Sequence, residues 1–377
     1  MPIRLNQLTG LRFFAAAMIM DGHSWRLFGP SYLDGMMLVH GVSIFFVLSG
    51  FILAVAYPTT ADVTSRNFLR ARIARVWPLH ILSTLLLLAV VPGVTNQFFT
   101  SGGLLTAIQY VTLTQAWLPI LENIMAYTAV SWSISAEVFF YATFPLWLMD
   151  WGRFNSLKLP VAIMPTIFLI QISNFADLPL ALDSPGINAG TMLYFFPVAR
   201  LPEFVLGVIV GQYWYRRQFR FSSGQSDIAS LAAIALSVGA LYYAAPIAGS
   251  PITAGLLGKA GGVWLLPAGF GPVYALLIFV LASSTGYITR ILGSRPLVLL
   301  GEISFGMYLF HSIFLRYIER HPDLIAEAPN YWRLVYWVTV SAFSYAAYEL
   351  FEKPARDWIN GRHARKWLKK DETLKVV

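Results

Sequence analysis

The chain has 377 residues, of which 57% are hydrophobic and only 12% charged, and its mean hydropathy is +0.60. Soluble domains carry about 25% charged residues, so this composition excludes an ordinary soluble enzyme and predicts a polytopic membrane protein. The net charge of +8 comes from basic residues between apolar runs, which fits contact with anionic membrane lipids better than a nucleic-acid partner. Because there is no cysteine, disulfides, thiolate metal sites and thiol nucleophiles are excluded.

Ten apolar runs are long enough to be transmembrane helices. They lie near residues 11–28, 36–57, 77–93, 133–149, 159–174, 191–214, 228–246, 260–284, 298–318 and 331–351. These runs predict one all-α transmembrane bundle over 1–360, followed by a basic tail over 361–377. Basic residues cluster after the second, fourth, sixth, eighth and tenth runs, so we expect those loops and both termini to be cytoplasmic. The first run lacks a convincing cleavage site and is expected to stay in the membrane.

Residues 103–121 are apolar enough to form an eleventh helix. A full span there would move the loop that holds Arg153 and Lys158 to the opposite side of the membrane. We therefore interpret 103–121 as a re-entrant or interfacial segment, which requires that other parts of the protein cover its backbone.

The first apolar run carries Arg12, Asp21 and His23. Ionisable side chains inside a membrane are energetically costly, so they indicate a functional site by default. Arg12 and His23 are eleven residues apart, which is about 16 Å along a helix. This spacing predicts a fixed cation near one membrane surface and a titratable imidazole near mid-depth. The structural alternative is that Arg12 extends to the interface and His23 makes a polar helix contact.

The next two runs combine a small-residue pair with an arginine pair. Ser49 and Gly50 lie in an aromatic stretch of the second run, where small residues favour close helix packing. Arg72 and Arg75 are three residues apart and share a helix face, with Pro78 at the start of the third run. Two guanidinium groups at a cytoplasmic entrance suit bidentate phosphate binding, although headgroup binding and topology are the equally weighted alternative.

Three later runs also carry polar groups. Ser133 and Glu137 are four residues apart and face one way at the outer start of the fourth run, which suits proton transfer, a sugar hydroxyl or a helix cap. Arg200 and Glu203 are expected to neutralise each other in the sixth run. His311 places a second imidazole in the ninth run.

Other chemistries are not indicated. The six histidines form no His-x-x-x-His pair, so no metal site is predicted. The nucleophile elbow of serine hydrolases and the glycine-rich phosphate loop are also absent from the sequence. Glu349 and Glu352 close the last run and are interpreted as anchors at the membrane interface.

Taken in order, these motifs resemble those of the integral-membrane acyltransferase 3 family, from about residue 3 to 357. The points of resemblance are Leu8-Thr-Gly-Leu-Arg12 with His23, Phe45 to Phe51, Arg72-x-x-Arg75-x-x-Pro78, Trp132-Ser133-x-x-x-Glu137-x-x-Phe140-Tyr141, Arg200-x-x-Glu203-Phe204-x-x-Gly207, Ser304-x-x-x-Tyr308-Leu-x-His311 and Glu352-Lys-Pro354. The sequence departs from the family pattern at Asp21, where an apolar residue is usual, and at His80, where an aromatic residue is common. Asp21 is expected to tune or orient His23.

The resemblance implies a membrane O-acyltransferase of the bacterial inner membrane. Its donor would be an acyl-coenzyme A, with acetyl-CoA favoured, and its acceptor a hydroxyl of a glycan, an exopolysaccharide or a lipid-linked sugar. Arg72 and Arg75 would then hold the coenzyme A phosphates, and Arg12 would place the pantetheine arm or the thioester. His23 would act as general base on the acceptor or carry the acyl group covalently.

The remaining polar residues are assigned to the acceptor. Ser133 and Glu137 would position it or relay a proton at the outer side, with further contacts from Asp21, Arg200, Glu203 and His311. An exporter that moves a glycan or lipid along the same polar helix faces is the alternative from another class, and a catalytically silent scaffold is the third. Against an exporter, the two halves of the chain show no matching pair of broken helices.

Overall fold

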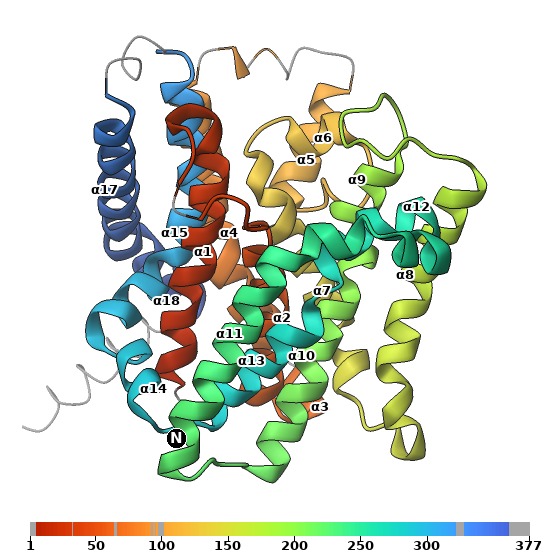
Figure 1. The fold of residues 1–377 in the computed structure, drawn as a ribbon. Helices are drawn as coiled ribbons and strands as arrows, with labels where there is room; N and C mark the ends of the chain where they lie inside the picture. The colour runs from red at the N-terminus through yellow and green to blue at the C-terminus, as the bar shows by residue number, and fades with distance from the viewer. Residues whose placement is uncertain are drawn as a thin grey trace, which may run out of the picture.

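The computed structural model describes residues 5–31, 33–63, 66–91, 93–94, 96, 102–321 and 328–361. Within these ranges the chain is a bundle of helices with no β-strand (Figure 1), as the sequence predicts. An all-helical bundle satisfies every backbone hydrogen bond inside each segment, which an apolar surrounding requires. Beyond Gly361, the predicted basic tail lies outside the described residues.

The described residues of the first half of the chain form ten helical elements. These are α1 (Asn6–Phe28), α2 (His40–Ala56), α3 (Thr60–Val63), α4 (Arg66–Val90), α5 (Gly103–Thr112), α6 (Leu121–Met125), η2 (Ala129–Ser131), α7 (Trp132–Leu148), η3 (Gly152–Leu157) and α8 (Lys158–Phe175). The second half continues the bundle. Its elements are α9 (Ala189–Tyr194), α10 (Pro197–Arg217), α11 (Ser223–Ala248), α12 (Pro251–Ala268), α13 (Gly271–Ser283), α14 (Tyr287–Leu292), α15 (Arg295–Ile318), α17 (Pro329–Ala347), η4 (Tyr348–Glu352) and α18 (Lys353–Ile359).

Each of the ten predicted runs falls on a helix or on two consecutive helices. Six segments are long and apolar enough to cross a membrane. They are Asn67–Val90, Gly152–Phe175, Ala189–Arg217, Gly224–Ala248, Pro251–Ser283 and Arg295–Ile318. Helix α2 is apolar but shorter. The described part of the chain therefore has six candidate spans, and the other four stay a prediction.

Helix α4 corrects one boundary. The sequence places the third run near residue 77, with Pro78 at its start, but the helix begins at Arg66 and continues through Pro78. A proline inside a helix removes one backbone hydrogen bond without always ending the helix. Arg72 and Arg75 consequently sit on an ordered helix and not in a connecting loop.

Residues 103–121 form a broken segment, and one continuous eleventh helix is not present there. Helix α5 ends where Leu113 adopts a positive φ of 57°, and α6 begins only at Leu121. The irregular stretch between them packs on α7, where the Trp117 indole donates to the Ser135 carbonyl oxygen at 3.1 Å. Gln115 is fully buried and bonds to Ser131 at 3.0 Å. These contacts hold part of the stretch against α7, and its re-entrant placement stays a prediction.

Glycines allow close helix contacts around the site. Gly50 of α2 and Gly207 of α10 each face a backbone oxygen of the other helix, and a Cβ on either would overlap it. This confirms the close packing expected at Ser49 and Gly50. Gly301 of α15 lies directly against the Thr9 backbone of α1. Because side chains cannot separate these pairs, α1 is held next to α15, and polar groups on the two helices meet.

Candidate active site

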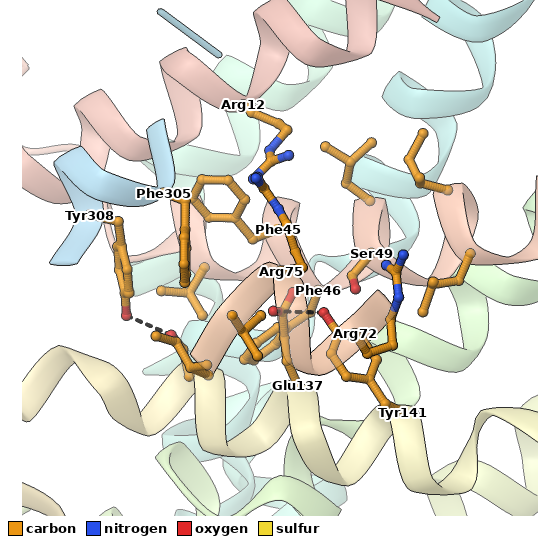
Figure 2. Close-up of a pocket in the computed structure, with 17 residues that line it drawn as sticks. Arg12, Phe45, Phe46, Ser49, Arg72, Arg75, Glu137, Tyr141, Phe305 and Tyr308 are labelled. Atoms are coloured by element: carbon orange, nitrogen blue, oxygen red, sulfur yellow. Dashed lines mark hydrogen bonds between the residues drawn. The ribbon is translucent and has the colours of Figure 1, made fainter. Parts of the chain in front are cut away.

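Two neighbouring cavities contain most of the predicted site residues. The first, which we call the arginine cavity after Arg12, Arg72 and Arg75, has a volume of about 130 Å³. Its walls come from α1, α2, α4, α7 and α15 (Figure 2). The second, the histidine cavity, is about 220 Å³ and contains His23. Val42 and Tyr308 line both cavities and therefore form the wall between them.

The arginine cavity holds more positive charge than the nearby carboxylates neutralise. Among the described residues, no side chain accepts a hydrogen bond from Arg12 or forms an ion pair with it. Arg72 donates to the Tyr57 hydroxyl at 3.3 Å and lies over the rings of Tyr57 and Tyr141, 5.4 and 5.8 Å from their centroids. Aromatic faces attract a guanidinium without cancelling its charge. The guanidinium groups of Arg12 and Arg72 therefore stay available to an anion.

Arg75 differs because a carboxylate already holds it. Its Nη1 lies 2.5 Å from Oε1 of Glu352, whose side chain is only 1% exposed. The interpretation of Glu352 as an interfacial anchor is therefore wrong, because the chain forms a π-helical turn at η4 and places this carboxylate in the interior. Glu349 pairs with Lys353 at 2.5 Å, both 36% exposed.

Ser133 and Glu137 of α7 both line the arginine cavity, which confirms that they share one helix face. Glu137 accepts a hydrogen bond from the Tyr141 hydroxyl at 3.0 Å (Figure 2). Ser133 donates to the Tyr308 hydroxyl at 2.7 Å, and Tyr308 donates to the Val130 carbonyl oxygen at 2.6 Å. These bonds fix Tyr308 in the shared wall. The structure thus groups Ser133 and Glu137 with the arginines. An acceptor site around His23 would require both residues to line the histidine cavity, and neither does.

The histidine cavity is lined by the second half of α1, by the loop that leads to α2, and by side chains of α2, α7, α9 and α15. His23 is exposed to it. Asp21 lines the same cavity and accepts a hydrogen bond from the Ser31 hydroxyl at 2.5 Å. Residues two apart on a helix point about 200° away from each other, so Asp21 does not orient the His23 ring.

His311 is the residue that contacts the His23 ring. Its Nε2 lies 2.8 Å from Nδ1 of His23, and the two rings stack with an interplanar angle of 15°. His311 is fully buried, lines neither cavity and bonds through Nδ1 to the Tyr308 carbonyl oxygen at 2.6 Å. The structure therefore places His311 behind His23, where it is not positioned to touch an acceptor.

Arg200 and Glu203 also lie away from both cavities. They form a buried ion pair in α10, with Arg200 Nε 2.6 Å from Glu203 Oε2, and Arg200 also donates to the Ser43 hydroxyl at 3.2 Å. This confirms the expected mutual neutralisation. It does not support an acceptor contact for either residue, because neither lines a cavity wall.

Tyr308, Tyr141 and Glu352 are the site residues to which sequence reasoning assigned no role in the site. All three belong to the quoted motifs. An aromatic residue one turn from a predicted site residue is the signal that could have found Tyr308 and Tyr141, whereas Glu352 has no such local signal. In the part of the chain that the structure describes, no three His, Asp or Glu side chains converge as metal ligands would.

The apolar helices and the polar side chains that line the two cavities indicate an integral membrane protein with an enzyme-like site. Residues 5–348 match the family described as "Acyltransferase domain", so the chain belongs to the acyltransferase 3 family and is an acyltransferase. This membership favours the enzyme over the exporter and the silent scaffold.

Curated relatives agree with this assignment. Acyltransferase MdmB of Streptomyces mycarofaciens is 29% identical over 355 residues, which cover 90% of this chain and 85% of MdmB. O-acetyltransferase OatA of Staphylococcus aureus is 23% identical over 94% of this chain but only 58% of its own length. Nodulation protein 10 of Rhizobium leguminosarum bv. viciae is 26% identical over 56% of this chain and 60% of its own. No solved structure matches the chain.

Proposed function

We propose that the protein moves an acyl group, with acetyl favoured, from acyl-coenzyme A to a hydroxyl of a glycan, an exopolysaccharide or a lipid-linked sugar. One observation carries this proposal: a cavity with uncompensated guanidinium groups shares a wall with a second cavity that exposes an imidazole. The first suits an anionic donor, and the second suits a hydroxyl that must lose a proton. The name of the relative O-acetyltransferase OatA supports both the acetyl group and the hydroxyl acceptor.

The arginine cavity is assigned to the donor. Coenzyme A carries phosphates, and a guanidinium binds phosphate bidentately. Among the described residues, Arg12 and Arg72 have no carboxylate within ion-pair distance, whereas Arg75 shares its charge with Glu352. We therefore assign the larger share of phosphate binding to Arg12 and Arg72. Coenzyme A is far larger than a cavity of about 130 Å³. The cavity would accept the pantetheine arm beside Phe45 and Phe305, with the adjoining diphosphate at the arginines and the adenosine outside.

The histidine cavity is assigned to the acceptor. Aromatic side chains and hydroxyl-binding carboxylates line it together, as expected of a sugar site, and they include Trp25, Trp132, Tyr194, Asp21 and Asp34. No lysine or arginine is among its described lining residues. The two aspartates therefore disfavour an anionic acceptor in this cavity.

The chemical step places both substrates at the shared wall. His23 takes the proton from the acceptor hydroxyl, the acceptor oxygen bonds to the acyl carbon, and the thioester bond breaks to release coenzyme A as a thiolate that is then protonated. In the covalent version, His23 Nε2 bonds to the acyl carbon and the thioester bond breaks to release coenzyme A as a thiolate. The acceptor oxygen then bonds to the acyl carbon, the bond to Nε2 breaks, and the acceptor proton passes to the freed imidazole nitrogen. Both versions need the acyl group to pass Val42 and Tyr308.

The donor side would face the cytoplasm of a bacterium, with ten spans in the inner membrane and both termini cytoplasmic. Two features support this orientation. The first is the basic residues at the start of α4 and in the connections after α7, α10 and α13. The second is that the start of α1 and the loop from α10 to α11 lie at the same end of the bundle (Figure 1). The broken segment α5–α6 lies at the opposite end, where a re-entrant segment would enter from outside.

The decisive experiment measures consumption of acetyl-CoA by the purified protein, with and without added glycan. We expect glycan to accelerate the release of coenzyme A and to become labelled when the acetyl group is radioactive. If the protein leaves every acyl-CoA intact, whichever acyl length and acceptor class are tried, the assignment of donor and acceptor is wrong.

A further inference from the structure

A chain of three polar groups ends at the His23 ring. The Tyr308 carbonyl oxygen faces His311 Nδ1 at 2.6 Å, and His311 Nε2 faces His23 Nδ1 at 2.8 Å. A carbonyl oxygen only accepts hydrogen bonds, so His311 Nδ1 must carry the hydrogen. A neutral imidazole then has an acceptor at its other nitrogen, so His311 Nε2 accepts, and His23 Nδ1 must donate.

This polarity selects one tautomer of His23. With its hydrogen on Nδ1, the neutral ring has its free lone pair on Nε2, the one ring nitrogen that His311 leaves free. The reverse tautomer would bring two lone pairs together at the 2.8 Å contact between the rings and would block Nε2 with a hydrogen. The Tyr308 carbonyl oxygen therefore fixes the tautomer of His311, and His311 in turn fixes the tautomer of His23.

We propose that His311 is a positioning residue that holds His23 as the Nδ1–H tautomer and directs its Nε2 lone pair to the acceptor hydroxyl. This inference rests on the proposed function, and it gives His311 a role other than contact with the acceptor. When Nε2 takes the acceptor proton, the Nδ1–H bond to His311 also stabilises the imidazolium, as an orienting partner does in a catalytic triad. The same lone pair would attack the acyl carbon in the covalent version.

The fold makes this arrangement rigid. His311 is fully buried, its carbonyl partner lies three residues earlier on the same helix, and the Tyr308 side chain is itself held by Ser133 and Val130. Gly301, ten residues before His311, brings α15 against α1. The pair therefore does not depend on a mobile loop.

Two substitutions separate positioning from a structural role. In His311→Gln the amide oxygen can lie near the former Nε2 and accept from His23, whereas His311→Phe fills the space but accepts nothing. General-base catalysis is worth about 10²–10⁴-fold, so we expect His311→Phe to lower kcat about 10²-fold with KM for acetyl-CoA unchanged. His311→Gln should stay within about tenfold of the native rate, because the acceptor is retained.

His80→Phe is the matched control. His80 is a second fully buried imidazole that bonds to a carbonyl oxygen, that of Tyr110 at 2.8 Å, but it lies outside both cavities. A general cost of losing a buried histidine would lower folded yield in both phenylalanine variants alike. We expect the loss of kcat only in His311→Phe.

A measurement without substrate tests the tautomer itself. In protein labelled with ¹⁵N-histidine, the His23 signals are assigned by their loss in His23→Gln. We expect a protonated Nδ1 and an unprotonated Nε2 in the native protein, and a shift toward the reverse tautomer in His311→Phe. A hydrogen on Nε2 of native His23, or native kcat in His311→Phe, would overturn the proposal. If the tautomer is as expected but no acceptor is acylated, the proposed function fails, whereas the assignment of the His23 tautomer to His311 stands.

Discussion

Arg75 and Glu352 allow the stability of the fold to be separated from donor binding. Arg75→Ala removes the partner of a carboxylate that is 1% exposed and whose second oxygen has no hydrogen-bond partner among the described residues. Removing one partner of a buried pair costs about 3–5 kcal/mol, because the remaining charge is uncompensated. We therefore expect Arg75→Ala to lower Tm and folded yield markedly in detergent.

The double variant Arg75→Met/Glu352→Leu provides the comparison. Replacing both charges with apolar side chains of similar volume is often neutral or stabilising, so its Tm should return to near the native value. If Arg75 also contacts the donor, the double variant should bind acetyl-CoA more weakly than the native protein although its Tm is restored. Unfolding is followed by intrinsic fluorescence at one scan rate, and donor binding by calorimetry on the same preparation. A native Tm for Arg75→Ala would refute the reasoning about the buried pair.

Three further predictions concern the donor, the topology and the packing. Arg72→Ala should weaken acetyl-CoA binding by about tenfold or more in calorimetry. Arg72→Lys should also bind weakly, because an ammonium lacks the bidentate fork. Normal binding by both variants would show that Arg72 is not part of the donor site. Reporter fusions after Arg220 and Lys369 should both report cytoplasm, and a signal from the opposite side at either would break the ten-span topology. Gly207→Ala should cost about 1–3 kcal/mol through overlap with α2, seen as a lower Tm, whereas Gly239→Ala, which faces open space, should be neutral.

Local sequence patterns predicted the helices well, because each depends on residues near one another in the chain. The shared faces of Arg72 with Arg75 and of Ser133 with Glu137 follow from helical spacing, and both pairs line the arginine cavity. Gly50 likewise indicated close packing, which the contact with α10 confirms. In each case a period of 3.6 residues was sufficient information.

The contacts between distant residues that form the site could not be predicted from helical spacing. His23 meets His311 across 288 positions, and Arg75 meets Glu352 across 277. Such pairs depend on how far one helix slides along another, and on the π-helical turn that turns Glu352 inward. Neither the relative position of two helices nor the π-helical turn has a local sequence signal. Asp21 was therefore expected to act on His23 only because it is near in sequence, whereas its structural partner is Ser31.

The central claim is that His23 performs the transfer, and His23→Ala tests it most directly. The substitution removes a polar ring that is exposed to a cavity, so insertion and folding should be unharmed, and the arginine cavity should still bind acetyl-CoA. Loss of a general base costs about 10²–10⁴-fold in rate, and loss of a covalent acyl carrier would cost more.

Folded yield, acetyl-CoA binding and transfer should therefore be measured on one preparation of His23→Ala. The account predicts native yield, native binding and almost no transfer. Near-native transfer by this variant would contradict it, and so would a loss of transfer that only parallels a loss of folded protein.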